Sequence, residues 1–376
     1  MTSLDLRTHL TSGGVFHLDL RHLEALTDDT GILQHAVFNM PNRKEGYCTD
    51  DNARALILVV MLESRGLLPR NASHGYVGTY FSFIWDAFND ENQRFRNFMS
   101  YSHIWIERVG SDESHARALW ALGSVIRLSK NDGLVGAAER LWVKSLDAIS
   151  SFESSRADAI AIFGLVEYVV VRADARAVDL IRTLGSRLVG LYRENSDSGW
   201  RWFDDKLTYF NARLPHALLL AGEVLSDREM LDVGLQTLEW LVTIQKDPQG
   251  YFAPVGSNGF WPRRGARAWF DQQPIDAYAT LSACIVASRI TKNQLWTDEI
   301  NLAFNWFLGC NHLQLPVYDF STGGCRDGVH KDRLNQNQGA ESTLAYLLSL
   351  AELENYGTIK IQQNADSERD GIHREP

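Results

Sequence analysis

The sequence predicts an all-α protein in which six helical hairpins close into a ring, an (α/α)6 toroid. Two observations lead to this prediction: a polar segment that continues into an apolar helix recurs six times along the chain, and an amphipathic helical stretch precedes each copy. Each hairpin of such an array has an apolar face that only a neighbour can cover, and a closed ring covers all of these faces. We therefore expect a single toroid domain over residues 1–355.

The recurring segment begins with polar or acidic residues and continues as an alanine-rich helix. Its six copies begin at Thr49, Asp112, Ser155, Tyr209, Asp271 and Asn337. A helix that is apolar on nearly every side is buried, because a surface helix has one polar face. These copies are the predicted inner helices of the ring.

The amphipathic stretches have apolar residues at helical spacing, which is typical of helices that cover a core from outside. They span residues near 20–38, 77–90, 133–148, 175–193, 229–245 and 295–308. The alternation therefore predicts an outer and an inner helix, six times over. The polar segment 356–376 that follows is expected to be a disordered tail.

The composition is globular and acidic. Hydrophobic residues make up 45% of the chain, charged residues 22%, and the formal net charge is −10. An acidic surface counts against nucleic acid or an anionic membrane as a partner. The chain begins without a secretory signal pattern and has no run of ~20 apolar residues. We expect a cytoplasmic protein with reduced, widely spaced cysteines and with no metal or cofactor.

The connections that lead into the predicted inner helices are long and rich in aromatic and charged residues. They include residues 98–105, 199–205, 251–273 and 318–330, whereas a reverse connection such as 226–229 is short. In a ring of hairpins, all the long connections open on the face that holds the inner-helix N-termini. Such an asymmetry marks one functional face.

Five of the eleven tryptophans lie in these long connections, namely Trp105, Trp200, Trp202, Trp261 and Trp269. An indole beside carboxylates suits a sugar, whose apolar face stacks on an aromatic ring while its hydroxyl groups form hydrogen bonds. We single out Trp202 and Trp261 as stacking candidates, and packing of the connections onto the ring is the alternative. The hydrogen-bonding candidates are Asp50, Arg54, Asp205, Asn211, Gln272, Gln273, Asn337 and Gln338.

Carboxylates recur at the predicted starts of the inner helices. Helix capping explains part of this pattern, since an Asp at an N-terminus accepts backbone N–H bonds. The doubled Asp50-Asp51 exceeds the need of one cap, and Glu341 follows an apparent cap region. Two carboxylates across a pocket are the minimum equipment for cleaving a glycoside.

Other chemistries lack their motifs: the chain has no phosphate-binding loop, no dinucleotide fingerprint and no nucleophile elbow. His115 and His216 lie on predicted inner helices. They are a possible proton-transfer pair, although histidines so placed are more often hydrogen-bonded within a core or pocket.

Five motifs carry a resemblance that covers nearly the whole chain. They are Asp28-Asp-Thr-Gly-Ile-Leu-Gln-His, Gly46-Tyr-Cys-Thr-Asp-Asp-Asn-Ala-Arg-Ala-Leu, Gly256-Ser-Asn-Gly-Phe-Trp, Phe270-Asp-Gln-Gln-Pro and Asn337-Gln-Gly-Ala-Glu-Ser-Thr. With them the chain resembles the six-hairpin glycosidase superfamily and, more narrowly, a bacterial family of toroid proteins that occur beside or fused to glycosyltransferase-like proteins. The resemblance implies a toroid, a sugar ligand and a possible glycosyltransferase partner.

Some similar enzymes place a base in an Asp-rich turn at the first inner helix and an acid near the last. The resemblance thereby implies Asp51 as base and Glu341 as acid, with Asp271 as the rival for either role, in an inverting hydrolase of an oligosaccharide or other glycoside. A phosphorylase would need an anion pocket, for which Arg263, Arg264 and Arg267 are candidates. A histidine-dependent sugar epimerase and a non-catalytic glycan-binding or glycosyltransferase-associated subunit remain the alternatives.

Overall fold

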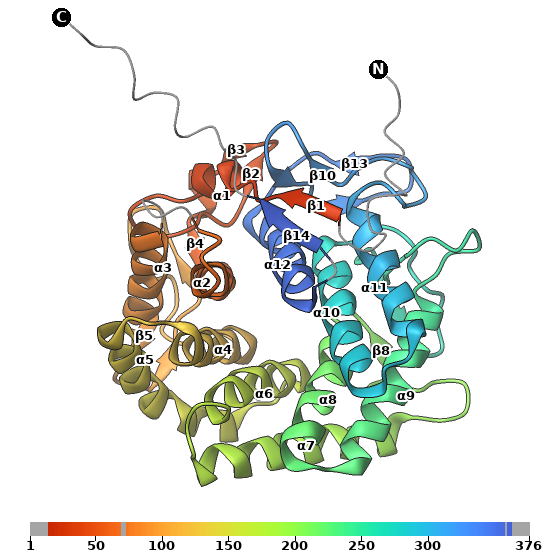
Figure 1. The fold of residues 1–376 in the computed structure, drawn as a ribbon, viewed down its shortest axis with the longest axis horizontal. Coiled ribbons are helices and arrows are strands. Elements are labelled where there is room, and N and C mark those ends of the chain that lie inside the picture. Colours follow the sequence, from red (N-terminus) through yellow and green to blue (C-terminus); the bar gives the residue numbers. More distant parts are fainter. Residues whose placement is uncertain (1–13, 69–72, 358, 363–376) are drawn as a thin grey trace, which may run out of the picture.

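The computed structural model describes residues 14–68, 73–357 and 359–362, and within them the chain folds as an (α/α)6 toroid (Figure 1). Six inner helices surround the centre: α2 (Thr49–Ser64), α4 (Asp112–Leu128), α6 (Ser155–Val169), α8 (Arg213–Leu225), α10 (Pro274–Thr291) and α12 (Ala340–Tyr356). The outer helices are α1 (Arg21–Leu26), α3 (Ser73–Ala87), α5 (Asp132–Ser145), α7 (Ala175–Asn195), α9 (Arg228–Ile244) and α11 (Gln294–Phe307).

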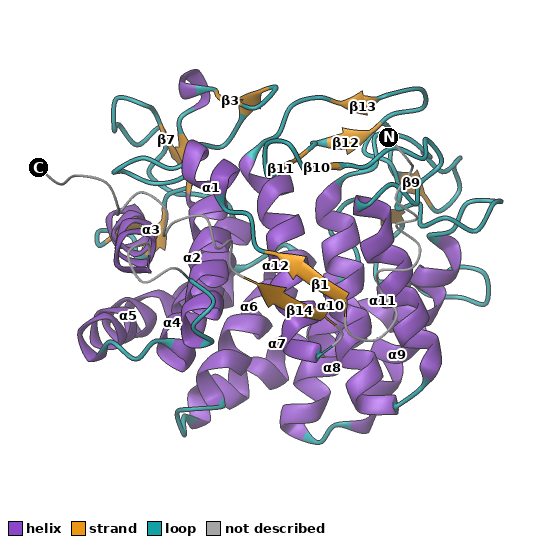
Figure 2. Cartoon of the chain, turned by 45° about the horizontal axis from the view of Figure 1, so that its top comes forward, coloured by secondary structure: helices purple, strands orange, loops and turns teal. Residues whose placement is uncertain are grey.

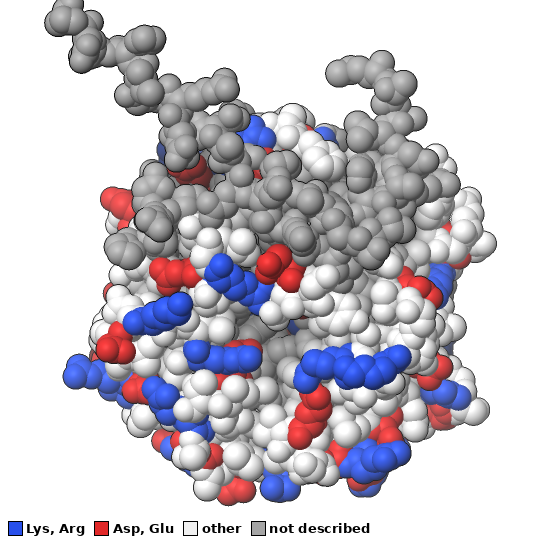
Figure 3. Space-filling view, viewed as in Figure 1, with Lys and Arg blue, Asp and Glu red and all other residues white. Residues whose placement is uncertain are grey.

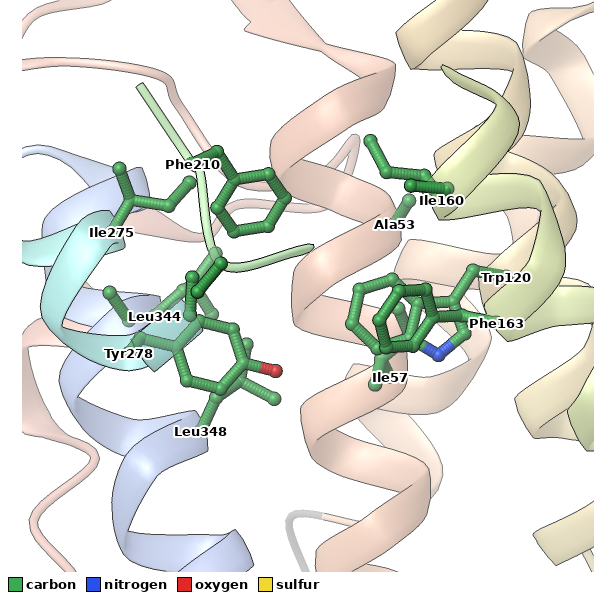
Figure 4. Packing of buried hydrophobic residues seen from close by; sticks show 14 of the residues in the cluster. Ala53, Ile57, Trp120, Ile160, Phe163, Phe210, Ile275, Tyr278, Leu344 and Leu348 are labelled. Atoms are coloured by element: carbon green, nitrogen blue, oxygen red, sulfur yellow. The ribbon is translucent and has the colours of Figure 1, made fainter. Parts of the chain in front are cut away.

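The inner helices form a closed ring. Each contacts the next in chain order, and α12 returns to α2 (Figure 1). One continuous apolar core runs through them from Leu18 to Leu353. Buried apolar side chains of α2, α4, α6, α10 and α12, together with Phe210, which precedes α8, pack inside the ring (Figure 4). This explains why the inner helices are apolar on nearly every side: each faces two neighbours, an outer helix and the centre.

The first outer helix is much shorter than predicted. Helix was expected near residues 20–38, but α1 ends at Leu26. The reason is local, because the Asp28 side chain accepts the backbone N–H groups of Thr30 and Gly31 and so folds a turn. The other outer helices begin and end within a few residues of their predicted bounds.

Short strand pairs tie the long connections together. The antiparallel pairs are β2 (Ala36–Val37) with β3 (Met40–Pro41), β4 (Tyr47–Cys48) with β7 (Phe98–Met99), β5 (Phe88–Asn89) with β6 (Arg94–Phe95), β8 (Lys206–Leu207) with β9 (Trp261–Pro262), β10 (Tyr318–Asp319) with β11 (Gly324–Cys325), and β12 (Gly328–Val329) with β13 (Leu334–Asn335). Two of them, β4–β7 and β8–β9, join connections that lead to different inner helices, and a bridge between Gln272 and Val329 links two more connections.

A parallel pair brings the two ends of the described chain together, as β1 (Gly14–His17) lies beside β14 (Ile359–Gln362). Strand β14 falls inside the segment 356–376 that we expected to be disordered, so that expectation is corrected for these four residues. The pairing satisfies backbone hydrogen bonds that a free tail would give to water. Residues 363–376 lie outside the described part of the chain.

The long connections all lie on one face, above the N-termini of the inner helices (Figure 2). We call this end of the ring the mouth. As predicted, Asp51, Asp112, Asp158, Asn211, Gln273 and Gln338 all lie within, or just before, the first turn of an inner helix. None of the helices in the described part of the chain has the length and apolar composition needed to cross a bilayer.

The opposite face carries short connections and many charged side chains around a central hollow (Figure 3). Ion pairs join neighbouring inner helices at this end: Arg65 with Glu354, Arg127 with Glu167, and Arg289 with Glu223. They link α2 to α12, α4 to α6 and α8 to α10. These pairs hold neighbouring inner helices together at the end opposite the mouth.

Candidate functional site

One guanidinium group at the mouth joins three carboxylates. Arg54 donates from Nη1 to Asp51 Oδ1 at 2.7 Å, and from Nη2 to Asp50 Oδ2 at 3.0 Å and to Glu341 Oε2 at 2.8 Å. The structure thus brings together Asp50, Asp51, Arg54 and Glu341, all of which the sequence singled out. Because α2 and α12 are neighbours in the ring, Asp51 and Glu341 lie on the same side of the mouth.

Local helix geometry builds this cluster. Asp50 and Asp51 lie in the first turn of α2, and Arg54 follows one turn later, the spacing at which helical side chains meet. Helix α12 begins after Gly339, which has no capping side chain, and Asp327 instead accepts the Gly339 N–H at 2.8 Å. This tertiary cap leaves the Glu341 carboxylate free to reach Arg54.

The three carboxylates differ in their affinity for protons. Burial would raise the pKa of Asp50, but Arg117 and Arg54 outweigh burial and hold it below its usual value. Burial raises the pKa of Asp51 and of Glu341, against the attraction of Arg54. The Glu341 side chain is nevertheless 43% accessible, because it lies deep between the helices but faces the open mouth, and solvent there limits the rise.

Beneath the carboxylates lies a layer that we call the floor, formed by Arg117 and Phe210. Arg117 of α4 donates from Nε to Asp50 Oδ1 at 2.5 Å, and its guanidinium group lies 4.9 Å from the centre of the Phe210 ring. Arg213 lies at the same distance from this ring, and Phe210 is fully buried. Arg117 Nη1 is buried and has no hydrogen-bond partner among the described residues. The charge of Arg117 therefore acts on the site through Asp50, because the guanidinium group itself is buried.

Asp276 of α10 is a site residue that the sequence reasoning missed. Burial raises its pKa to about 7, although the backbone N–H groups of Asn211 and Phe210 donate to it. Its Oδ1 is buried without a hydrogen-bond partner among the described residues. A single carboxylate within an otherwise apolar helix was the available signal, because Asp is almost never fully buried without a partner.

Asp271 lies in the connection before α10 and is not part of the Arg54 cluster. Its Oδ2 accepts from Ser257 Oγ at 2.8 Å, and its Oδ1 lies 3.4 Å from His330 Nδ1. Its backbone has a left-handed φ of 59°, which is uncommon for a residue with a side chain. Asp271 and His330 form a separate, half-buried carboxylate–imidazole pair.

The two tryptophans proposed to stack on a sugar pack against other aromatic rings. Trp202 is only 2% exposed and lies against Phe203 and Trp240 of α9. Trp261 is half-buried between Trp200 and Trp240. The packing interpretation therefore describes Trp202, and the expectation that its indole is exposed is corrected.

The amide side chains mostly hold the connections in place. Asn211 bonds the Thr208 backbone, Asn337 accepts the Phe38 N–H, and Gln338 joins Thr322 to Asp319. Gln272 accepts from Trp306 of α11 and so faces outward. The two remaining candidates lie at the mouth: Gln273 is the residue before α10, and Asp205 is exposed.

Neither histidine of the proposed proton-transfer pair is available for that role. His115 is buried between the Phe95 N–H and the Ser145 carbonyl, and burial lowers its pKa to about 3. His216 is buried against Phe163 beside Arg213, and burial holds its pKa well below the usual value. Both are core residues, which was the alternative interpretation.

Two of the three arginines proposed for an anion pocket have structural roles. Arg263 pairs with Asp197, and Arg267 donates to two backbone carbonyls and stacks 3.9 Å from the Trp269 ring. Arg264 is exposed. The cationic groups nearest to the carboxylate cluster are instead Arg54 and Arg117.

Two surface pockets lie away from this cluster. One is lined by residues at the far ends of α2 and α4, including Glu63 and Leu128, and the other by residues of the 88–111 connection, including Trp105. Neither contains paired carboxylates that face the ring interior. Within the described residues, no group of three or more His, Cys, Asp or Glu side chains could hold a metal ion.

The fold is that of several sugar-active enzymes of known structure. A cellobiose 2-epimerase from Bacillus thermoamylovorans aligns with a TM-score of 0.69 at 12% identity, over 89% of this chain and 96% of that one. A D-mannose isomerase aligns with a TM-score of 0.69 at 10% identity, over 95% and 98%. A GH76 α-mannanase from Bacteroides thetaiotaomicron aligns with a TM-score of 0.62 at 11% identity, over 89% and 94%.

These identities are low, so the likeness shows the shared fold. No protein-family model matches the chain. No curated protein matches it.

Proposed function

We propose that this protein is a carbohydrate-active enzyme that cleaves a glycosidic bond with Glu341 and Asp50. One observation carries the proposal: two accessible carboxylates share Arg54 at the mouth, and their surroundings shift their pKa values in opposite directions. Such a pair is the signature of an acid and a base assigned by environment. The fold, shared with enzymes whose names specify cellobiose, mannose and mannan, supports a sugar substrate.

In this mechanism Glu341 is the general acid. Its raised pKa keeps the proton available for the glycosidic oxygen, and Arg54 stabilises the carboxylate that remains after the proton has left. Asp50, held ionised by Arg117 and Arg54, is the group that attacks the sugar carbon or activates water. Asp51 is only 5% exposed and bound by Arg54 and Cys48, so it positions Arg54 instead of serving as the base.

The separation of the Asp50 and Glu341 carboxylates predicts whether cleavage retains or inverts the configuration at the sugar carbon. Asp50 Oδ2 and Glu341 Oε2 both accept from Arg54 Nη2, so they lie no farther apart than these two bonds together. That limit is closer to the separation of about 5–5.5 Å in retaining glycosidases than to the roughly 6.5–9.5 Å of inverting ones. The proposal therefore favours retention over the inversion that the resemblance implied.

A second candidate function, sugar epimerisation or isomerisation, is favoured by a different observation. His330 and Asp271 form a half-buried pair in the connections at the mouth, and an imidazole beside a carboxylate is a suitable general base. His115 and His216 cannot take this role because both are core residues. This alternative depends on His330 and tolerates loss of the Glu341 carboxyl.

One experiment separates the two. The purified protein is incubated with 4-nitrophenyl glycosides and with free and disaccharide sugars, and products are followed by nitrophenol release and by NMR. Glu341→Gln and Asp50→Asn should each lower cleavage by orders of magnitude, since an amide keeps the shape but cannot transfer the proton. His330→Asn is the matched control and should cleave normally. Epimer formation that is lost in His330→Asn and kept in Glu341→Gln would instead establish the alternative.

A further inference from the structure

A second polar cluster lies at the mouth, on α4, α6 and the connection before α8. Glu113 Oε1 accepts from Arg156 Nε at 3.1 Å, and Glu113 Oε2 accepts from the Tyr209 hydroxyl at 2.9 Å. Arg156 also donates to Thr208 Oγ1 at 2.7 Å, and its guanidinium group lies 4.4 Å from the Tyr209 ring centre. These contacts join the three side chains into one group.

This cluster is well placed to meet the part of a substrate that extends beyond the carboxylates. In the order of contacts around the ring, α6 is three helices from α12 in either direction, so Arg156 lies across the mouth from Glu341 (Figure 1). Arg156 lies in the first turn of α6, and its side chain is 25% exposed, so part of it remains open to a ligand.

The rim of the mouth is lowest beside this cluster. The connection from α5 to α6 is residues 146–154, which include the 3-10 helix η3 (Leu146–Ser151), and it is the shortest connection into an inner helix; the next shortest is 196–212, before α8. The connection before α8 carries Tyr209, and Phe210 directly after it forms part of the floor. A substrate that rises from the floor can therefore leave over α6, past Arg156 and Tyr209.

The floor limits what fits beneath the carboxylates. Arg117 touches both Asp50 and the buried Phe210 ring, so the carboxylates lie directly above the floor and the ring is closed below them. A sugar unit bound to Asp50 and Glu341 therefore has no neighbour on its inner side. The rest of the molecule must extend outward, toward the low rim.

We infer that Glu113, Arg156 and Tyr209 form a binding subsite for a second sugar unit, so that the protein acts on the terminal unit of an oligosaccharide. This inference rests on the proposed function. Arg156 keeps N–H donors beyond those that bond Glu113 and Thr208, and the Tyr209 oxygen, whose proton goes to Glu113, can accept from a sugar hydroxyl. Glu113 accepts from Arg156, Tyr209 and Ser154, which leaves a carboxylate lone pair for a sugar hydroxyl.

Binding to the inactive Glu341→Gln protein tests the subsite without requiring turnover. Cello-, manno- and malto-oligosaccharides of one, two and three units are titrated by calorimetry. In at least one series the disaccharide should bind at least about tenfold more tightly than the monosaccharide, as hydrogen bonds to charged groups predict. Adding Arg156→Met or Tyr209→Phe should remove most of this gain and leave monosaccharide affinity unchanged.

Controls separate the subsite from folding and from the proposed reaction. Arg172→Met removes an arginine of the outer surface, paired with Glu139, and should change neither affinity. Thermal denaturation shows whether each variant is folded, and Glu113→Gln replaces any variant that is not. Equal affinities for one and two units, or a gain that survives all three substitutions, would overturn the subsite. If the wild-type protein cleaves no glycoside but the disaccharide still binds more tightly than the monosaccharide, the proposed function is overturned and the subsite stands. The two failures are distinguishable because binding is measured separately from cleavage.

Discussion

At the scale of single residues, the sequence predicted the carboxylates at the mouth better than their partners. Doubling at Asp50-Asp51 and an acid after a cap at Glu341 are local signals, and these residues do meet at Arg54. Arg117 was not predicted, because its importance depends on which helices are neighbours, and Asp276 was missed although a carboxylate within an apolar helix is a local signal. A single sequence does not show that α4 places the Arg117 guanidinium group against the Asp50 carboxylate of α2.

The aromatic residues show that composition alone does not predict the role of a side chain. A tryptophan in a long connection can stack on a sugar or pack the connection onto a helix, and both uses need the same residue. Trp202 packs on Trp240, an outer-helix residue some forty positions away, so only the tertiary structure distinguishes the two. Likewise, His115 has two backbone partners that lie far apart in sequence.

Asp276 gives a pH prediction. Its pKa of about 7 in the folded protein exceeds the unfolded value of about 3.9, so between these pH values only the unfolded state releases the proton. This group should therefore lower the free energy of unfolding by about 1.4 kcal/mol for each pH unit between pH 4 and 7, with the full penalty present above pH 7. In urea denaturation at pH 5, 6 and 7, wild-type stability relative to Asp276→Asn should fall as pH rises.

Asp112 provides the matched control for this measurement. Burial would raise its pKa, but the Glu153 N–H and Arg94 outweigh burial and lower it. Its contribution is therefore present above the unfolded pKa and is lost as pH falls through the folded value. The difference between wild type and Asp112→Asn should change with pH in the opposite direction and at more acidic pH. A flat or rising difference for Asp276→Asn would contradict its placement in a buried, partly unpartnered site.

At the scale of elements, helices were predicted well because their signals are local. Apolar spacing located the outer helices, and alanine-rich runs located the inner ones. The exception is α1, which ends at Leu26 although the amphipathic pattern continues. The Asp28 side chain accepts the Thr30 N–H and so forms a turn in place of further helix. The two-residue strands are too short to show an alternating apolar pattern, and the partners in β4–β7 and β8–β9 come from different connections.

The packing of α4 on α6 gives a second prediction. A Cβ at Gly123 would lie 2.4 Å from the Gly164 carbonyl oxygen, and a Cβ at Gly164 would lie 2.8 Å from the Leu119 carbonyl oxygen. Backbone atoms cannot move aside as a flexible side chain can. Gly123→Ala should therefore lower the free energy of unfolding by about 1–3 kcal/mol despite its better helix propensity. Chemical denaturation at constant pH measures the change.

Gly136 in α5 is the control, because a Cβ there meets no atom within 4 Å. Gly136→Ala should stabilise the protein by about 0.5–1 kcal/mol, since alanine loses less conformational freedom in a helix. If Gly123→Ala stabilises the protein as Gly136→Ala does, then α4 and α6 are not in the close contact described.

At the scale of the whole molecule, closure is the property that the sequence implied and the structure shows. Six copies of one segment require neighbours on both sides, and the contact of α12 with α2 supplies the last one. The order of the chain around the ring is then fixed, but the position of its ends is not. Here β1 and β14 place the two ends side by side at the α12 edge.

A closed ring should therefore tolerate new chain ends. Joining residue 376 to residue 1 and opening the chain between Arg172 and Ala173 should preserve the fold. The opened position lies in the short connection between α6 and α7, where no inner-helix contact is cut. The permuted protein should show the helical circular dichroism of wild type and one cooperative unfolding transition within several degrees of it.

The control permutant is opened between Ile160 and Ala161, inside α6. Both residues are fully buried, and α6 contacts α4 and α8 within the ring, so new charged ends there cannot be solvated without opening the core. This permutant should be unfolded or should aggregate. If instead the first permutant unfolds in two separate transitions, the chain consists of two units that merely touch, and the single-domain prediction for residues 1–355 is wrong. If it unfolds in one transition, the protein is stabilised by closure of the ring, and the position at which the chain begins and ends does not matter.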